Sequence, residues 1–145
     1  VVADCQSSSQ YGDISKYKNV DFVSPTEREI RLALSDNNSS LSVLANHFRE
    51  KTSVKNIVIT LGQQGILING RYKGNYHTDR LPSFNSSPVD TSGAGDSFIC
   101  STSIFFRQGF SIWESVFLGS IAASIKVSKN GNVPISLNEI LNLLN

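Results

Sequence analysis

The chain has 145 residues and carries 13 basic and 12 acidic side chains, for a formal net charge of +1 at pH 7. This near balance, without a cluster of Lys and Arg, argues against nucleic acid as a partner, and the apolar runs are too short and interrupted to cross a membrane. A length of this order suits one domain with a fair core.

Strands alternate with helices along the first half of the chain. Patterning predicts strands over residues 1–4, 21–23, 57–59, 66–69 and 72–78, and helices over 26–34 and 41–49. The last third is predicted to be helical, over residues 94–108, 112–127 and 137–144, with Ser111 and Glu114 forming a capping box. This alternation indicates an α/β fold with a mainly parallel sheet that helices cover on both faces.

Polar side chains follow several of the predicted strands. Parallel α/β sheets bind their ligands beyond the carboxyl ends of the strands. We therefore expect a binding site at one edge of the sheet, where four strand ends would converge: Asp4, Ser24, Thr60 and Asp90.

The cysteines and histidines favour neither a disulfide nor a metal site. Cys5 and Cys100 are far apart in the sequence and lie in apolar stretches. We expect buried free thiols rather than a disulfide, which fits a cytoplasmic protein. His47 and His77 have no partner at metal-ligand spacing, which disfavours a transition-metal site.

The segment from Asp90 to Asp96, Asp-Thr-Ser-Gly-Ala-Gly-Asp, is the most informative part of the sequence. Its small residues Gly93, Ala94 and Gly95 precede a long apolar run and predict a tight turn that opens a helix. A helix N-terminus presents unpaired N–H groups to an anion, and glycines let the anion approach the backbone. Asp96 would then be a base beside a phosphate, as phosphoryl transfer requires. The alternative is a structural cap, in which Asp96 only stabilises the helix dipole.

Two further segments fit phosphate chemistry. An apolar strand runs into residues 24–26 and an acidic helix start that contains Glu29. Thr60, Gly62 and Gly65 belong to a glycine-bracketed turn between two β-branched strands. Ordinary first-turn acids and a plain hairpin are the alternatives. The chain has no G-x-x-x-x-G-K-[ST] loop, no dinucleotide G-x-G-x-x-G and no G-x-S-x-G elbow.

These three segments resemble those of the ribokinase-like (PfkB) carbohydrate kinases. Residues 90–96 match that family's D-T-x-G-A-G-D signature, and residues 60–65 are similar to its T-x-G-x-x-G segment. Glu29 matches the Glu of T-P-N-x-x-E, in which Thr26 replaces the usual Asn. All three belong to the later part of the family's domain. We therefore expect residues 1–145 to be the C-terminal, nucleotide-binding portion of a three-layer α/β/α kinase domain.

The resemblance implies transfer of a phosphoryl group from ATP, with Mg²⁺, to a sugar or sugar-phosphate hydroxyl. Asp96 would be the catalytic base, with Gly93, Ala94 and Gly95 completing the anion hole. The nucleotide would contact Thr60, Gly62, Gly65, Thr91, Ala123, Val127 and Asn130. Glu29 would organise magnesium indirectly, and Asp90 and Ser92 would hold a monovalent cation such as K⁺. Residues 24–29 resemble, among the family's branches, heptose-7-phosphate kinase-like proteins linked to ADP-heptose synthesis.

Two functions stay open at this point. The first is a carbohydrate kinase, a homodimer in its full-length form, whose isolated 145 residues are a poor catalyst because the sugar-binding half is missing. The second is a non-catalytic nucleotide-binding or assembly module. Sequence outside the 145 residues would separate the two.

Overall fold

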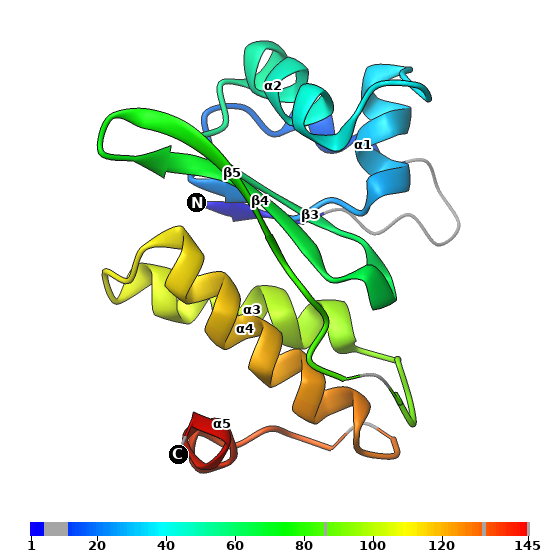
Figure 1. Ribbon diagram of the computed structural model, residues 1–145, viewed down its shortest axis with the longest axis vertical. Helices are drawn as coiled ribbons and strands as arrows, with labels where there is room; N and C mark the ends of the chain where they lie inside the picture. The colour runs from blue at the N-terminus through cyan, green and yellow to red at the C-terminus, as the bar shows by residue number, and fades with distance from the viewer. Residues whose placement is uncertain (5–11, 86, 132, 145) are drawn as a thin grey trace. The chain divides into compact units, whose positions relative to one another are not determined.

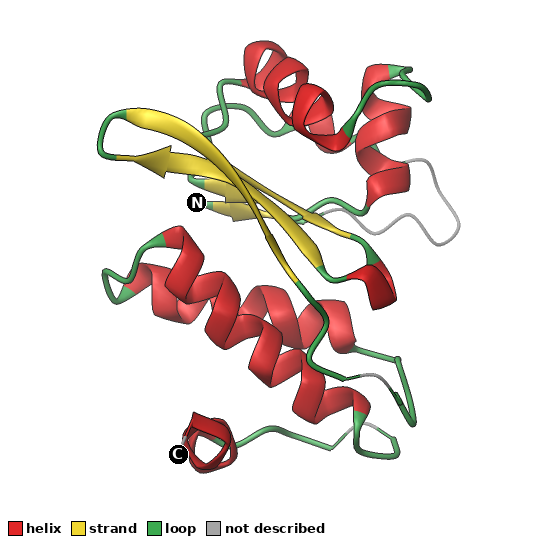
Figure 2. Ribbon diagram, viewed as in Figure 1, coloured by secondary structure: helices red, strands yellow, loops and turns green. Residues whose placement is uncertain are grey.

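The structure is a computed structural model that describes residues 1–4, 12–85, 87–131 and 133–144 (Figure 1, Figure 2). The chain forms two compact units, Val1–Leu81 and Pro82–Asn145. The strands and the first two α-helices belong to the first unit, and the last three helices belong to the second. Among the described residues, no helix combines the length and apolar character that a membrane crossing requires.

The first unit is built on a five-stranded sheet with the strand order β1-β2-β3-β4-β5. Its strands are β1 (Val2–Ala3), β2 (Phe22–Val23), β3 (Asn56–Thr60), β4 (Ile66–Tyr72) and β5 (Asn75–Leu81). β1, β2 and β3 pair in parallel, whereas the β3–β4 and β4–β5 pairs are antiparallel. The sheet is thus mixed rather than mainly parallel. Short turns join β3 to β4 and β4 to β5. These pairs are antiparallel because a parallel pair needs a crossover of a dozen or more residues.

The last hairpin of the sheet turns at Lys73 and Gly74. Their φ angles are 47° and 88°, and two successive positive φ values are typical of a two-residue type I′ turn. A strand does follow, as the weak alternation over residues 72–78 predicted, but it begins only at Asn75. It carries His77, which pairs with Gly70 of β4.

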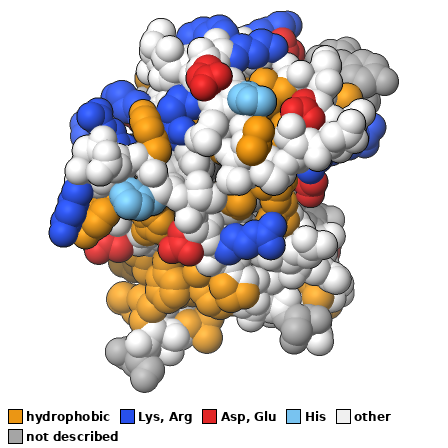
Figure 3. All heavy atoms as spheres, turned by 45° about the horizontal axis from the view of Figure 1, so that its top comes forward, with side chains coloured by type: hydrophobic (Ala, Val, Ile, Leu, Met, Phe, Trp, Pro, Cys, Tyr) orange, Lys and Arg blue, Asp and Glu red, His pale blue; other side chains and the backbone are white. Residues whose placement is uncertain are grey.

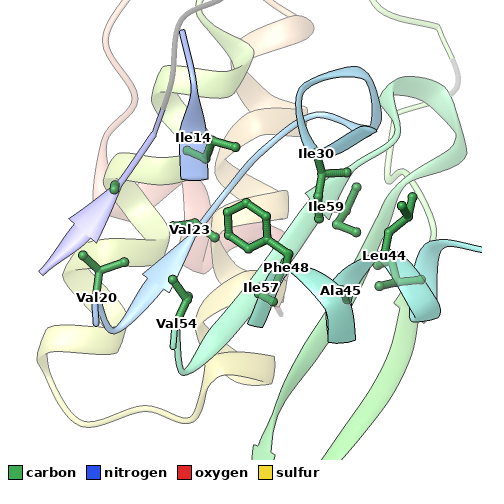
Figure 4. Close-up of a cluster of buried hydrophobic side chains, with 12 residues drawn as sticks. Ile14, Val20, Val23, Ile30, Leu44, Ala45, Phe48, Val54, Ile57 and Ile59 are labelled. Carbon is green, nitrogen blue, oxygen red and sulfur yellow. The ribbon is translucent and has the colours of Figure 1, made fainter. Parts of the chain in front are cut away.

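Two helices pack on one face of this sheet (Figure 1). The helical elements of the unit are η1 (Ile14–Lys16), α1 (Glu27–Leu34), α2 (Leu41–Thr52) and η2 (Gly62–Gln64). The apolar side chains Leu44, Ala45 and Phe48 of α2 are fully buried in a cluster with Ile57 and Ile59 of β3 (Figure 4). Complete burial of a large apolar side chain is worth about 1.5–3 kcal/mol, so this cluster anchors α2 on the sheet.

Both faces of β3 are covered. Ile57 and Ile59 belong to the cluster under the helices, and Val58 between them is also fully buried. Successive side chains of a strand point to opposite faces. A central strand buried on both sides is typical of an α/β sheet, as the sequence predicted.

The second unit contains α3 (Ala94–Arg107), α4 (Ile112–Val127) and α5 (Leu137–Leu144), which agree with the predicted ranges to within one residue. The capping box at α4 is present, because Ser111 and Glu114 each accept the other's backbone N–H. α3 and α4 approach closely at Gly119, where a Cβ would lie 2.0 Å from Thr102 Oγ1 and 3.0 Å from the Phe98 carbonyl oxygen. Only glycine fits at this crossing.

Cys100 differs from its prediction. Its side chain is exposed, not buried. Phe98 and Thr102, four residues apart, define the buried face of α3, and residues two positions apart on a helix do not share a face. Cys5 lies outside the described residues.

Asp90 also differs from its prediction. β5 ends at Leu81, and Asp90 lies in the connection between that strand and α3 rather than at a strand end. Asp4 and Ser24 do follow β1 and β2, and Thr60 is the last residue of β3. Since those strands are parallel, these three residues share one edge of the sheet.

Candidate functional site

The signature segment forms the turn that leads into α3. Gly93 is the N-cap residue of this helix, with φ 73°, and the Ala94 amide donates to the Thr91 carbonyl oxygen at 3.2 Å. A Cβ at Gly93 would be strained at this φ and would lie 3.3 Å from Lys126 Cε. The tight turn that the sequence predicted therefore requires glycine at Gly93.

The N-terminus of α3 is open. Side-chain pairs cap the other helices α1, α4 and α5: Thr26 with Glu29, Ser111 with Glu114, and Ser136 with Glu139. No side chain caps α3 within the described residues. The N-cap residue of α2, Ser40, has a hydroxyl that could cap its helix but makes no capping bond. The N-cap residue of α3, Gly93, has no side chain and therefore cannot make one. Since Ala94 already bonds Thr91, the Gly95 and Asp96 amides are the donors that α3 offers to an anion, at the positive end of its dipole.

Asp96 differs from the acids at the same position of other helices. It is the third residue of α3, as Glu29, Glu114 and Glu139 are of theirs, and each of those carboxylates accepts the N–H of its own N-cap residue. Asp96 is exposed, and in the described part of the chain its carboxylate accepts no hydrogen bond from the protein. It can therefore accept a proton from a bound hydroxyl, besides stabilising the helix dipole.

Asp90 joins the signature segment to the turn after α4. Its Oδ1 accepts the Ser92 N–H at 2.9 Å, and its Oδ2 accepts the Gly131 N–H at 3.2 Å. The Asp90 amide in turn donates to the Val127 carbonyl oxygen at 3.2 Å. The hydrogen bonds from Ser92, then that from Gly131 and the charge of Lys126, hold the pKa of Asp90 below its ordinary value.

Three of the residues predicted to contact the nucleotide, Ala123, Val127 and Asn130, lie around the end of α4. Ala123 is half-buried and Val127 is buried, one helical turn apart on the same face of α4. Asn130 is exposed in the turn that follows. The bond between Asp90 and Val127 places this end of α4 beside the signature segment, so the second unit brings these predicted residues together with Asp90.

The turn after β3 is built around two glycines. Thr60 closes β3 beside the start of α1, where its N–H donates to the Pro25 carbonyl oxygen at 2.9 Å and it forms a parallel bridge with Thr26. Gly62 and Gly65 then bracket a single 3₁₀ turn with φ angles of 59° and 88°. The carboxyl ends of β2 and β3 therefore meet, as predicted, in the first unit.

Glu29 forms part of the capping box at the N-terminus of α1. It is 5% exposed, and its Oε2 accepts the Thr26 N–H at 2.7 Å while Thr26 Oγ1 accepts the Glu29 N–H at 3.3 Å. This arrangement fits an indirect role toward magnesium better than direct ligation. Acidic and histidine side chains are dispersed on the face in Figure 3, and no three His, Cys, Asp or Glu gather as metal ligands among the described residues.

Sequence reasoning missed Lys126. This side chain is 3% exposed, and its Nζ donates to the Gly131 carbonyl oxygen at 2.6 Å, while its Cε lies against Gly93. The signal in the sequence was a single basic residue between Ile125 and Val127 on a buried stretch of α4. Lysines are almost never fully buried without a partner.

The sequence matches the family model described as pfkB family carbohydrate kinase over residues 1–138. It is 28% identical over 131 residues to the bifunctional protein HldE of Magnetococcus marinus, and the matched segment covers 88% of this chain and 26% of that protein. The structure is similar to ribokinase from Thermotoga maritima, with a TM-score of 0.71 and 28% identity over 86% of this chain and 42% of that one. It is also similar to Arabidopsis thaliana ribokinase complexed with ribose and ATP, with a TM-score of 0.74 and 25% identity over 86% of this chain and 40% of that one.

The chain thus spans 26% of the curated relative and under half of each ribokinase. These neighbours confirm a ribokinase-like α/β fold. The family resemblance carried by residues 24–29, 60–65 and 90–96 is confirmed as well, since the matched region contains all three segments. The chain belongs to the pfkB family of carbohydrate kinases.

Proposed function

We propose that the protein containing this chain transfers the γ-phosphoryl group of ATP to a hydroxyl of a sugar or sugar phosphate. The observation that carries the proposal is the start of α3, where an uncapped helix N-terminus adjoins Asp96, whose carboxylate has no protein partner among the described residues. Membership of a carbohydrate kinase family supports the same reaction.

In the proposed reaction, Asp96 takes the proton of the acceptor hydroxyl while the hydroxyl oxygen attacks the γ-phosphorus. The bond between that phosphorus and the oxygen that bridges it to the β-phosphate breaks, and ADP leaves. The Gly95 and Asp96 amides donate to the oxygens of the moving phosphoryl group, each worth about 3 kcal/mol of barrier. Magnesium, when bound, neutralises charge on the ATP phosphates, and Glu29 would orient its water ligands.

Nucleotide contacts are proposed in each unit by itself. Thr60, Gly62 and Gly65 would approach the nucleotide phosphates, because their turn lies at the carboxyl end of two parallel strands, where α/β sheets bind ligands. In the second unit, Thr91 on the signature turn would contact phosphate. Ala123, Val127 and Asn130 would contact adenine from α4 and the turn after it.

The acceptor is proposed to be a sugar phosphate. Curated relatives of this chain are named bifunctional protein HldE, and residues 24–29 resemble heptose-7-phosphate kinase-like proteins. Incubation of the protein with ATP and matched pairs of free and phosphorylated sugars, heptoses included, tests this choice. Turnover of free sugars alone would contradict it.

Asp96→Asn tests the reaction itself. Asn is nearly isosteric and is a comparable residue for a helix start, so helix stability should change by less than about 1 kcal/mol. Loss of a general base should lower turnover by about 10²–10⁴-fold while the dissociation constant of ADP hardly changes. Asp79→Asn, which removes the same charge from an exposed residue of β5, is the control. Unchanged turnover would remove Asp96 from the mechanism, and a collapsed melting temperature would favour the structural cap.

The competing proposal is a non-catalytic nucleotide-binding module. It is supported by the fact that this chain spans only part of the length of its relatives. We propose that residues 1–145 alone bind ATP but phosphorylate sugars poorly, because holding the acceptor in line supplies several kcal/mol of barrier lowering. Isothermal titration with ATP and magnesium, alongside a sugar phosphorylation assay, checks both statements. No binding heat at saturating nucleotide, or robust phosphorylation, would contradict them.

A further inference from the structure

The turn after α4 is held by a positive charge that belongs to the chain. Lys126 lies in the last turn of α4 and is 3% exposed, and its Nζ donates to the Gly131 carbonyl oxygen at 2.6 Å. The Asp90 carboxylate accepts the N–H of the same residue, Gly131, at 3.2 Å. An ammonium group and a carboxylate therefore hold the two backbone polar groups of Gly131.

Lys126 also borders the signature turn. Its Cε is so near Gly93 that a Cβ there would approach it to 3.3 Å. Gly93 and Gly131 have φ angles of 73° and 74°, so this one side chain contacts both left-handed turns. Burial of an ammonium costs several kcal/mol unless it is paired. The Gly131 carbonyl and the nearby Asp90 carboxylate offset that cost.

The oxygen atoms that could bind a potassium ion here already accept hydrogen bonds from the chain. Such an ion is held by oxygen ligands, backbone carbonyls above all, and the family resemblance implied Asp90 and Ser92 for it. Both Asp90 oxygens already accept backbone N–H groups, and the Gly131 carbonyl already accepts Lys126. A second positive charge beside the Lys126 ammonium, which is 3% exposed, would also be repelled.

We propose that the Lys126 ammonium replaces a monovalent cation at the signature turn, so that the protein folds and binds nucleotide without potassium. Lys126 is then a positioning residue, which acts on the open N-terminus of α3 through Gly93 and through the bond between Asp90 and Gly131. The part of this inference that concerns nucleotide binding rests on the proposed function. The folded turn itself needs no nucleotide.

The test compares the wild-type protein with Lys126→Met, which keeps the apolar stem and removes the charge. Lys129→Met is the matched control, because Lys129 lies three residues further on, in the turn after α4, and bonds to Pro134 and Glu139 rather than to Gly131. Melting temperatures are measured without nucleotide in potassium chloride and in tetramethylammonium chloride at equal concentration. The dissociation constant of ADP is measured in the same two salts.

The wild-type protein and Lys129→Met should each show the same melting temperature in both salts. Folded Lys126→Met should melt about 2–5 °C higher in potassium, as mass action predicts for an ion that binds the native state at about tenfold its dissociation constant. A saturable rise of the wild-type melting temperature with potassium would overturn the proposal, and so would a folded Lys126→Met that responds no more than the control. If Lys126→Met does not fold, the wild-type comparison decides. Because these melts contain no nucleotide, they are independent of whether the protein is a kinase.

Discussion

The Asp90 carboxylate accepts the Gly131 amide at 3.2 Å and so joins two turns that are 41 residues apart in the sequence. Neither residue belongs to a helix or strand. The bond holds the turn after α4 beside the segment that opens α3, and so brings the proposed anion site and the proposed adenine contacts together. The contribution of this bond to stability can be measured, because it changes when Asp90 is protonated.

Asp90→Asn should reduce the acid sensitivity of the protein. The pKa of Asp90 is lowered from 3.8 in the folded chain, so its ionised form contributes stability that is complete above 3.8 and is lost as the pH falls through the folded value. The wild-type melting temperature should exceed that of the variant at neutral pH and converge with it in acid. Melting curves recorded down to about pH 3 test this, and two parallel curves would contradict it.

Gly93→Ala should both destabilise the protein and weaken nucleotide binding. A residue with a Cβ at φ 73° costs about 1–2 kcal/mol, and here the new methyl group also meets Lys126 Cε at 3.3 Å. Gly109→Ala is the control, because Gly109 has φ 99° but an open surrounding. Urea unfolding and ADP titration of both variants measure the two effects. Equal ADP binding by the two variants would show that the Gly93 turn has no part in the site.

Gly119→Ala should loosen the packing of α3 against α4. The added Cβ would lie 2.0 Å from Thr102 Oγ1 and 3.0 Å from the Phe98 carbonyl oxygen, and overpacking of this kind typically costs about 1–3 kcal/mol. Thr102→Ala removes the nearer clash, so the double variant should recover part of the lost stability. Urea unfolding of the four proteins in this double-mutant cycle is the measurement. Strictly additive losses would mean that the two residues do not meet.

Glu29 variants separate the cap of α1 from a role toward magnesium. Glu29→Gln keeps an oxygen that can accept the Thr26 N–H, so stability should change little, whereas Glu29→Ala should lose about 0.5–2 kcal/mol. If Glu29 organises magnesium, Glu29→Gln should also raise the magnesium concentration required for half-maximal turnover. Glu114→Gln, in the equivalent capping box of α4, should leave that concentration unchanged. Identical magnesium dependence in both Gln variants would limit Glu29 to capping.

The sequence by itself determined the helices of the second unit and the glycine turn of the signature segment. α4 begins after Ser111 and α3 begins after Gly93, as the local pattern predicted. Capping residues, glycine turns and apolar periodicity act over one helical turn, so they are readable without the fold. The glycine-bracketed turn at Gly62 and Gly65 was predicted for the same reason.

Only the tertiary structure decided which distant residues meet. The parallel pairing of β1, β2 and β3, the bond from Asp90 to Gly131 and the approach of Lys126 to Gly93 depend on segments far apart in the chain. A lysine between two apolar residues can extend into water or bury its charge, and the choice depends on whether an acceptor lies within reach. Here the folded chain brings the Gly131 carbonyl and the Asp90 carboxylate to Lys126, and the electrostatics of the buried ammonium fix what the sequence left open.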